Sequence, residues 1–241
     1  MCNVEDKSNN LTFNGRRGFL KTAGLATIGA ALSSPTLAAY SPKPENVISA
    51  NAALDRLMEG NMRYVKGDST LHNFNAEREA LVGGQNPYAC ILSCSDSRIT
   101  PEYAFDSARG DLFVVRVAGN FVSMNGLASL EYAVKYLGTR LLMVLGHQGC
   151  GAISGAISAI REGTVLPGRL PELIESIAPS VGLAINQPGD LLENAVRENV
   201  RLNVAALRAA SPILSEMVAT EELRVVGGVY NLESGQVDLL G

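Results

Sequence analysis

The 241-residue sequence has no Trp, only two His and only four Cys. Four Cys are too few to hold a chain of this length together through disulfides, so its stability must come from a hydrophobic core. Hydrophobic residues make up 46% of the chain and charged residues only 18%, which excludes disorder over most of its length. The formal net charge of −4 argues against a nucleic-acid partner. No apolar run reaches the roughly 18–20 residues of a membrane span, so stable membrane insertion is not expected.

The start of the chain has the composition of an export signal. A polar segment leads to the pair Arg16 and Arg17, and a weakly apolar run rich in Ala and Gly follows at residues 22–32. Small residues close the segment, and we expect cleavage after Ala38 or Ala39. The paired arginines resemble the twin-arginine signal of bacteria.

This pattern divides the chain into three parts. Residues 1–39 are predicted to form a twin-arginine-type signal peptide, residues 40–47 a linker and residues 48–241 a single folded domain that is exported to the periplasm. An amphipathic helix of the folded protein is the alternative interpretation of the first segment. Processing would leave three cysteines, Cys90, Cys94 and Cys150.

The remaining sequence alternates compact apolar segments with stretches of helical periodicity. Strands are expected at 88–93, 112–117, 140–145, 223–230 and 236–240. Helices are expected at 48–66, 127–137, 152–161, 170–181, 191–210 and 212–218, with a further short helix before Gly83. The last two strands flank Glu233-Ser234-Gly235, which indicates a hairpin. We therefore predict an α/β fold with one mostly parallel β-sheet, helices on its faces and an antiparallel edge strand at the C-terminal hairpin.

Side chains that can bind a metal follow two of the expected strands. The first strand is followed by Cys94-Ser95-Asp96-Ser97-Arg98, and the third by Gly146-His147-Gln148-Gly149-Cys150-Gly151. The carboxyl ends of parallel strands meet at one edge of a sheet, where ligands bind. Zn²⁺ takes Cys sulfur, His nitrogen and carboxylate oxygen in tetrahedral sites. The predicted ligands of one zinc ion per subunit are Cys94, His147 and Cys150, with Asp96 available as a fourth.

Asp96 and Arg98 stand two residues apart and allow two arrangements. Asp96 either binds the metal or pairs with Arg98, and in the second case the fourth metal position is open to water. Three protein ligands and a water are typical of catalytic zinc sites, whereas four protein ligands are typical of structural ones. An ordinary local ion pair is the simpler interpretation of the same two residues.

The cysteines have other interpretations as well. A disulfide between Cys94 and Cys150 suits an exported protein, and both could also be inert core thiols. We favour metal binding, because the other two interpretations leave His147 unexplained. Cys90 precedes Cys94 by four residues on a strand, which separates them by about 13 Å, so we expect Cys90 in the core.

The motifs CSDSR at residues 94–98 and GHQGCG at residues 146–151 together resemble the signature of the β-class carbonic anhydrases. The resemblance extends over about residues 51–240. It implies a lyase that hydrates CO₂ reversibly to bicarbonate and a proton through attack of zinc-bound hydroxide, a chemistry best known from carbonic anhydrases with three His ligands. It also implies Asp96 and Arg98 as the catalytic dyad.

The same resemblance implies a substrate pocket and an assembly. Gln85, Phe113 and Tyr132 match substrate-binding positions, some of which are contributed across the interface of a homodimer or higher homo-oligomer. Core packing is the alternative for the two aromatic residues, and simple exposure to solvent is the alternative for Gln85. Some family members bind inhibitory bicarbonate at a second site that uses a Trp, and this chain has none.

Two further functions fit the same residues. A hydrolase of a sulfur analogue of CO₂, such as CS₂ or COS, resembles this family in fold and ligands. A non-catalytic zinc-binding module would keep Asp96 permanently on the metal. His72, which lies in a polar segment, is expected to be a solvated loop residue, with a proton shuttle as the alternative.

Overall fold

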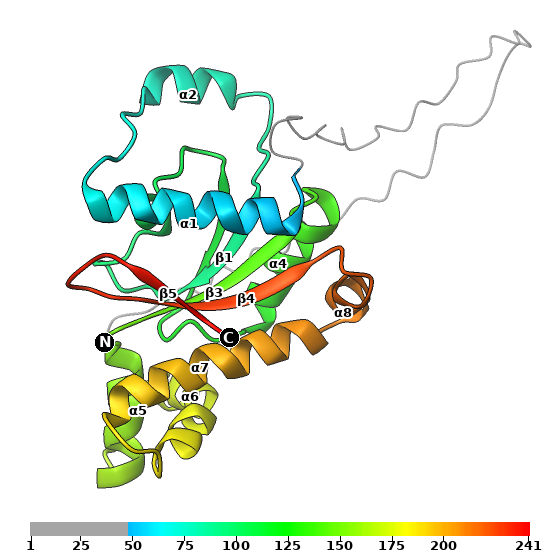
Figure 1. Ribbon diagram of the computed structural model, residues 1–241. Coiled ribbons are helices and arrows are strands. Elements are labelled where there is room, and N and C mark those ends of the chain that lie inside the picture. Colours follow the sequence, from blue (N-terminus) through cyan, green and yellow to red (C-terminus); the bar gives the residue numbers. More distant parts are fainter. Residues whose placement is uncertain (1–47) are drawn as a thin grey trace, which may run out of the picture. The chain divides into compact units, whose positions relative to one another are not determined.

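The computed structural model describes residues 48–241. The predicted signal peptide and linker therefore lie outside the described residues. Within the described part, a single α/β unit contains one five-stranded sheet with helices on both faces (Figure 1). None of its helices combines the length and the apolar character that crossing a membrane requires.

The sheet has the strand order β2-β1-β3-β4-β5. Its strands are β1 (Ala89–Ser93), β2 (Leu112–Arg116), β3 (Leu141–His147), β4 (Arg224–Tyr230) and β5 (Val237–Leu240). The first four are parallel and β5 is antiparallel to β4, so the predicted sheet and hairpin are confirmed. The third strand is longer than expected: Gly146 and His147 still pair with Val229 and Tyr230.

Alternate side chains of the central strands pack into two separate cores. Leu142 and Val144 face one core, which the helices from α4 to α8 cover, while Leu141, Met143 and Leu145 face the other. Every residue of β3 is buried, as expected for a strand covered on both faces.

The helix α1 (Ala50–Lys66) closes the second core. The Ser49 side chain caps its first turn by accepting a hydrogen bond from the Ala52 N–H, and Gly67 ends it in the left-handed conformation. Its apolar stripe, with Leu54 and Leu57, faces the sheet. Figure 1 shows α1 along one side of the sheet and α7 along the other.

The other helices follow the predicted pattern with small differences at their ends. They are α2 (Phe74–Ala80), α3 (Pro101–Ala104), α4 (Met124–Tyr136), α5 (Gly151–Glu162), α6 (Leu170–Ala184), α7 (Leu191–Ala209) and α8 (Pro212–Ala219). The largest shifts are of three residues: α6 ends at Ala184 and not at residue 181, and α4 begins at Met124, where the Ser123 side chain caps it by accepting a hydrogen bond from the Gly126 N–H. The single turn α3 was not predicted, since four residues carry no periodicity.

Candidate metal centre

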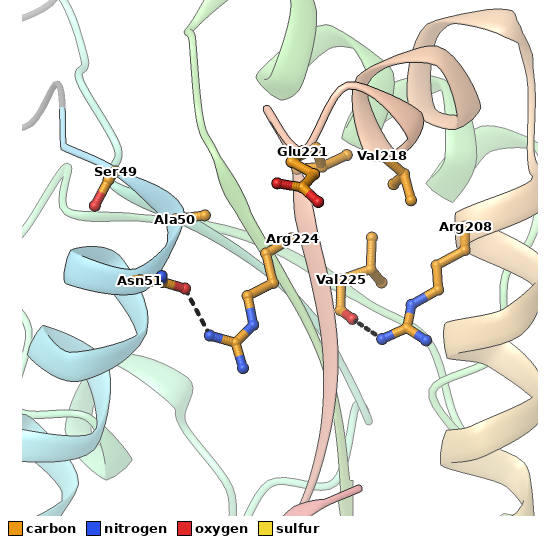
Figure 2. Close-up of a pocket in the computed structure, with 9 residues that line it drawn as sticks. Ser49, Ala50, Asn51, Arg208, Val218, Glu221, Arg224 and Val225 are labelled. Carbon is orange, nitrogen blue, oxygen red and sulfur yellow. Dashed lines mark hydrogen bonds between the residues drawn. The ribbon is translucent and has the colours of Figure 1, made fainter.

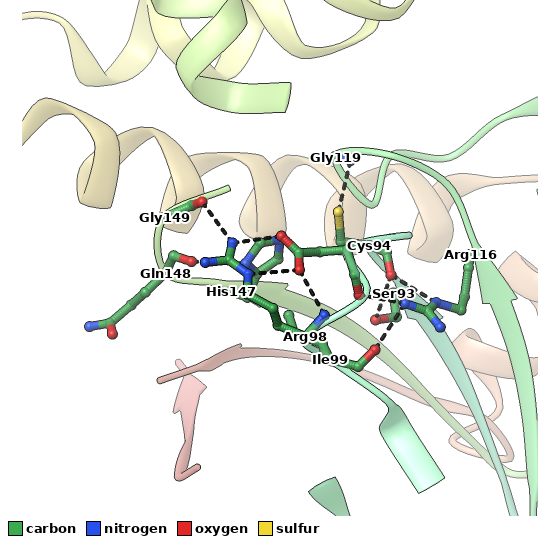
Figure 3. A network of polar contacts seen from close by, with 10 residues as sticks. Ser93, Cys94, Arg98, Ile99, Arg116, Gly119, His147, Gln148 and Gly149 are labelled. Atoms are coloured by element: carbon green, nitrogen blue, oxygen red, sulfur yellow. Dashed lines mark hydrogen bonds and ion pairs between the residues drawn. The ribbon is translucent and has the colours of Figure 1, made fainter. Parts of the chain in front are cut away.

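Three potential ligand side chains meet at the carboxyl edge of the sheet. One ligand atom each from Cys94, His147 and Cys150 lies within 4.8 Å of the others. All three residues are buried, with exposed fractions of 4%, 0% and 1%. Figure 3 shows Cys94 and His147 in the same network of polar contacts, with the Cys94 sulfur directed at Gly119. The sequence-based prediction that these residues converge is therefore confirmed, whereas their role as ligands stays a prediction.

The fold accounts for this convergence. β1 and β3 pair in parallel with Ser93 opposite Leu145, so Cys94 and the end of β3 leave the sheet side by side. Gly149 then turns the chain in the left-handed conformation (φ 62°), and Cys150 becomes the N-cap of α5. The positive end of a helix dipole favours a thiolate at that position.

His147 is held in the tautomer that a metal needs. Its Nδ1 lies 2.8 Å from the carbonyl oxygen of Gln148 (Figure 3). Because a carbonyl oxygen only accepts, Nδ1 carries the proton and the neutral ring leaves a lone pair on Nε2. This Nε2 is buried and has no hydrogen-bond partner in the part of the chain that the structure describes. A buried acceptor beside two sulfur atoms fits a metal ion.

The sulfur atoms of Cys94 and Cys150 shift each other's pKa. A hydrogen bond with Cys150 lowers the pKa of the Cys94 thiol, and the same interaction raises the pKa of Cys150. The backbone N–H of Gly119 donates a further hydrogen bond to Cys94 Sγ over 3.3 Å. Both cysteines are free thiols, so the predicted alternative of a disulfide is not what the structure contains. Metal binding would displace the remaining proton.

Asp96 pairs with Arg98 at the mouth of this group. The carboxylate accepts hydrogen bonds from Nε, Nη2 and the backbone N–H of Arg98 over 2.9, 2.7 and 2.9 Å. These bonds hold the pKa of Asp96 far below its usual range, so the group is ionised at neutral pH. Asp96 Oδ2 lies 3.9 Å from His147 Nε2. Of the two predicted arrangements, the structure contains the one in which Asp96 is engaged by Arg98.

A residue that sequence reasoning missed organises this loop. Arg116, the last residue of β2, donates to the backbone carbonyl oxygens of Cys94, Asp96 and Ile99 over 2.9, 2.7 and 2.9 Å (Figure 3). Three bonds from one planar guanidinium fix the course of the chain around Asp96. The available signal was a charged residue that ends an apolar strand, LFVVR, at the same edge of the sheet.

The three predicted substrate-binding residues lie elsewhere in the same chain. Gln85 and Tyr132 line one cavity of about 320 Å³ together with Gly110, and Tyr132 is 45% exposed. Gln85 precedes β1, whereas Cys94 follows it, and the five residues of β1 span about 16 Å. Phe113, on the edge strand β2, is half-buried, and its ring centroid lies 6.4 Å from that of Tyr132. One chain alone therefore does not bring these residues to the Cys94 group.

Two further predictions concern residues outside the site. Cys90 is fully buried and shares a hydrogen bond of 3.0 Å with Thr139 Oγ1, which confirms that it belongs to the core. His72 is half-buried and its Nδ1 lies 2.9 Å from Glu77 Oε1. His72 lies in a loop, as expected, but it is only partly exposed because its ring also contacts the Glu77 carboxylate on α2.

A separate cavity lies away from this chemistry. It has a volume of about 480 Å³ and is lined by residues of α1, α7, α8 and β4, among them Arg208 and Arg224 (Figure 2). Both arginines are tied to the chain: Arg224 donates to Asn51 Oδ1 and Arg208 to the Val225 carbonyl oxygen, each over 2.7 Å. None of the predicted site residues lines it.

Comparison with known proteins agrees with this geometry. The family described as carbonic anhydrase matches residues 89–237. "Carbonic anhydrase 2" of Mycobacterium tuberculosis is 39% identical over 189 residues, which cover 78% of this chain and 91% of that protein. "Carbonic anhydrase" of Mycolicibacterium smegmatis is 36% identical, with 78% and 92% covered.

Solved structures give the same assignment. A tetrameric β-carbonic anhydrase of Sordaria macrospora superposes with a TM-score of 0.61 at 27% identity, covering 70% of this chain and 86% of that one. The Coccomyxa β-carbonic anhydrase in complex with acetazolamide gives a TM-score of 0.61 at 29% identity, with 69% and 77% covered. By sequence and by fold, the chain belongs to the carbonic anhydrase family, in its β class.

Proposed function

We propose that this chain binds one Zn²⁺ through Cys94, His147 and Cys150 and there catalyses the reversible hydration of CO₂ to bicarbonate and a proton. The observation that carries the proposal is the buried convergence of these three side chains beside an aspartate that Arg98 keeps ionised. The carbonic anhydrase family membership supports the reaction.

The donor set supports zinc as the metal. Two thiolates and one imidazole are ligands that Zn²⁺ prefers, and His147 Nε2 has no hydrogen-bond partner among the described residues. When bound, zinc acidifies a coordinated water molecule and so supplies a nucleophile at neutral pH.

We propose that Asp96 orients this nucleophile and that Arg98 controls Asp96. An ionised carboxylate only accepts hydrogen bonds, so Asp96 Oδ2 fixes the direction in which a donor at the centre points its proton. Arg98 engages both carboxylate oxygens and also reaches the Gly149 carbonyl oxygen over 3.3 Å, which joins the two ligand-bearing loops. It thereby keeps Asp96 away from the ligand group.

We propose further that the active protein is a homodimer or a larger homo-oligomer. Gln85 precedes β1, Phe113 pairs with Cys90 near the start of β1, and Tyr132 lies beside both. We infer that these residues serve a metal centre of a neighbouring subunit, because Cys94 follows the other end of β1. A tetrameric relative in Sordaria macrospora is consistent with this assembly. Tyr132→Arg would place a charge in such an interface. We expect the variant to elute as a smaller species in size-exclusion chromatography and to lose activity, and an unchanged assembly would contradict the assignment.

The pairing of Asp96 with Arg98 distinguishes the proposal from one of its two alternatives. In a purely structural zinc module the carboxylate would be a permanent fourth ligand, whereas here Arg98 holds it. A hydrolase of CS₂ or COS would share the ligands and differ in access to them. Stopped-flow hydration of CO₂, run in parallel with a CS₂ hydrolysis assay on the zinc-loaded protein, decides between these: turnover of CO₂ supports the proposal, and turnover of CS₂ alone contradicts it.

We propose periplasmic localisation through the predicted twin-arginine signal. The support is the sequence alone, namely Arg16 and Arg17 ahead of an apolar run and small residues at Ala38 and Ala39. Replacement of both arginines by lysine should retain the full-length chain in the cytoplasm of a bacterial host. Cell fractionation measures this, and unchanged export of the double variant would contradict the prediction.

A further inference from the structure

The loop that follows β2, residues 117–122 and here called the β2 loop, adopts an unusual conformation beside the metal centre. Gly119 and Asn120 are both left-handed, with φ of 82° and 41°. A Cβ atom on Gly119 would lie 2.5 Å from Cδ1 of Ile177 on α6, and the left-handed φ would strain any other residue, so glycine is strongly favoured there. The Asn120 N–H donates to the Val117 carbonyl oxygen over 2.9 Å and closes the turn. A left-handed conformation at a residue other than glycine is strained, and it persists only where the surrounding structure holds it.

The β2 loop holds Cys94 from three directions. The Val117 N–H donates to the Ser93 carbonyl oxygen over 3.1 Å, and the Val117 carbonyl accepts from the Ser95 N–H over 3.3 Å. The Gly119 N–H points at Cys94 Sγ over 3.3 Å, as Figure 3 shows. The backbone on both sides of Cys94 and its sulfur are therefore fixed by one loop.

Two asparagines one helical turn apart on α7 hold the β2 loop from its other side. Asn199 Nδ2 donates to the Gly119 carbonyl oxygen over 2.8 Å, and Asn203 Oδ1 accepts from the Val122 N–H over 2.7 Å. Asn203 Nδ2 also donates to the Asn199 carbonyl oxygen over 2.7 Å. Both asparagines are buried, in the face of α7 that packs on the apolar core. Amides are costly in such a place unless they form hydrogen bonds.

The side chain of Asn120 does not help to fix the β2 loop. Its side chain is fully buried, yet neither polar atom of its amide has a hydrogen-bond partner among the described residues. The side-chain bonds that fix the β2 loop therefore come from α7, 80 residues further along the chain.

We propose that Asn199 and Asn203 are positioning residues for the metal centre, which hold the Gly119 N–H on the sulfur of Cys94 through the β2 loop. The inference rests on the proposed function, since it takes Cys94 to be a metal ligand. Groups that donate hydrogen bonds to a ligand orient it toward the metal, and their removal typically lowers metal affinity by about 10–100-fold. Asn199 and Asn203 act one step further out, so we expect an effect near the lower end.

The test is metal release from the full chain. Zinc-loaded wild type, Asn199→Ala and Asn203→Ala are mixed with a chromogenic chelator, and the cobalt-substituted proteins are compared by their sulfur-to-cobalt charge-transfer absorption. We expect Asn199→Ala to release zinc about 10-fold faster and to shift the absorption. Asn203→Ala should change both in the same direction and by less, because the Asn199 bond to Gly119 remains. If Asn199→Ala fails to fold, Asn203→Ala decides.

Asn194→Ala is the matched control. Asn194 also lies on α7 and also donates to a backbone carbonyl, that of Pro188 over 3.0 Å, but Pro188 is not part of the β2 loop. The Asn194→Ala variant should release zinc at the wild-type rate, and its cobalt spectrum should be unshifted. Wild-type release and spectra in both Asn199→Ala and Asn203→Ala would overturn the inference, even if their melting temperatures fall. A wild-type chain that takes up neither zinc nor cobalt would instead refute the proposed function, on which the inference rests.

Discussion

Replacement of Asp96 by Asn tests the role of the carboxylate with the smallest change in shape. Asp96 accepts three hydrogen bonds from Arg98, two of them on Oδ1. Asn retains one carbonyl oxygen and places an N–H group where the other oxygen accepts, so at least one bond to Arg98 is lost. The amide also carries no charge and can donate to the nucleophile that the carboxylate orients.

The expected magnitude separates activity from stability. A group positioned to direct a proton contributes about 10²–10⁴-fold to a rate. We therefore expect CO₂ hydration to fall about 100-fold or more, which corresponds to at least about 3 kcal/mol in the activation barrier. The Asp96–Arg98 ion pair is partly exposed, and such pairs contribute only about 0–1 kcal/mol to stability. The Tm should therefore fall by no more than about 4 °C.

The assay combines stopped-flow hydration with a pH indicator, zinc content and thermal melting. Because the Cys94, His147 and Cys150 side chains are untouched, the variant should still hold one zinc per chain. A variant that keeps its zinc and more than half of the wild-type rate would remove Asp96 from the mechanism.

The remaining predictions concern the ligands, the switch, the pH range and the packing. Cys150→Ser should lose zinc on dialysis, and retention of one zinc per chain would contradict its assignment as a ligand. Arg98→Ala should release Asp96 onto the metal, which a crystal structure of the zinc-loaded variant checks; an aspartate still off the metal would refute the switch. Because Arg98 holds the pKa of Asp96 below the usual ~3.9, the carboxylate stays ionised between pH 8 and pH 5 and its contribution to stability is lost only at lower pH. The difference in free energy of unfolding between wild type and Asp96→Asn should thus be constant over that range, and chemical denaturation at several pH values measures it. Gly146→Ala would place a Cβ atom 2.6 Å from Cγ2 of Val200 on α7. We expect this overpacking to lower the free energy of unfolding by about 2 kcal/mol and the Tm by about 4–8 °C. An unchanged Tm would mean that α7 moves to accommodate the methyl group.

The sequence predicted the fold class because each strand is a compact apolar segment and each long helix has a clear period. It did not predict where β3 ends, since Gly146 and His147 extend the strand only through pairing with Val229 and Tyr230. Pairing between segments some 80 residues apart leaves no trace in local periodicity. The order of the strands in the sheet was beyond reach for the same reason.

The residues of the candidate metal centre were predictable from their type and their position along the sequence. Cys94, His147 and Cys150 are rare residue types at the ends of two strands, and a parallel sheet brings such ends together. The state of Asp96 was not predictable, because its distance to Arg98 depends on the loop that Arg116 fixes. The hydrogen bond of Asn199 to Gly119 likewise exists only in the folded chain.

The predicted substrate-binding residues depend on a contact between chains. Gln85 and Tyr132 share a cavity, but β1 separates them from Cys94 of the same chain. Their proposed role requires a second subunit, and a contact between subunits leaves no signal in the periodicity of one chain.

The central claim is that one zinc ion, held by Cys94, His147 and Cys150, makes the protein a carbonic anhydrase. The most direct test is the rate of CO₂ hydration while zinc is titrated into the metal-free protein. The rate should rise in proportion to added zinc and stop rising at one equivalent per chain, and Cys150→Ser should show no such rise. No hydration at one equivalent of bound zinc, or the same titration curve in Cys150→Ser, would contradict the account.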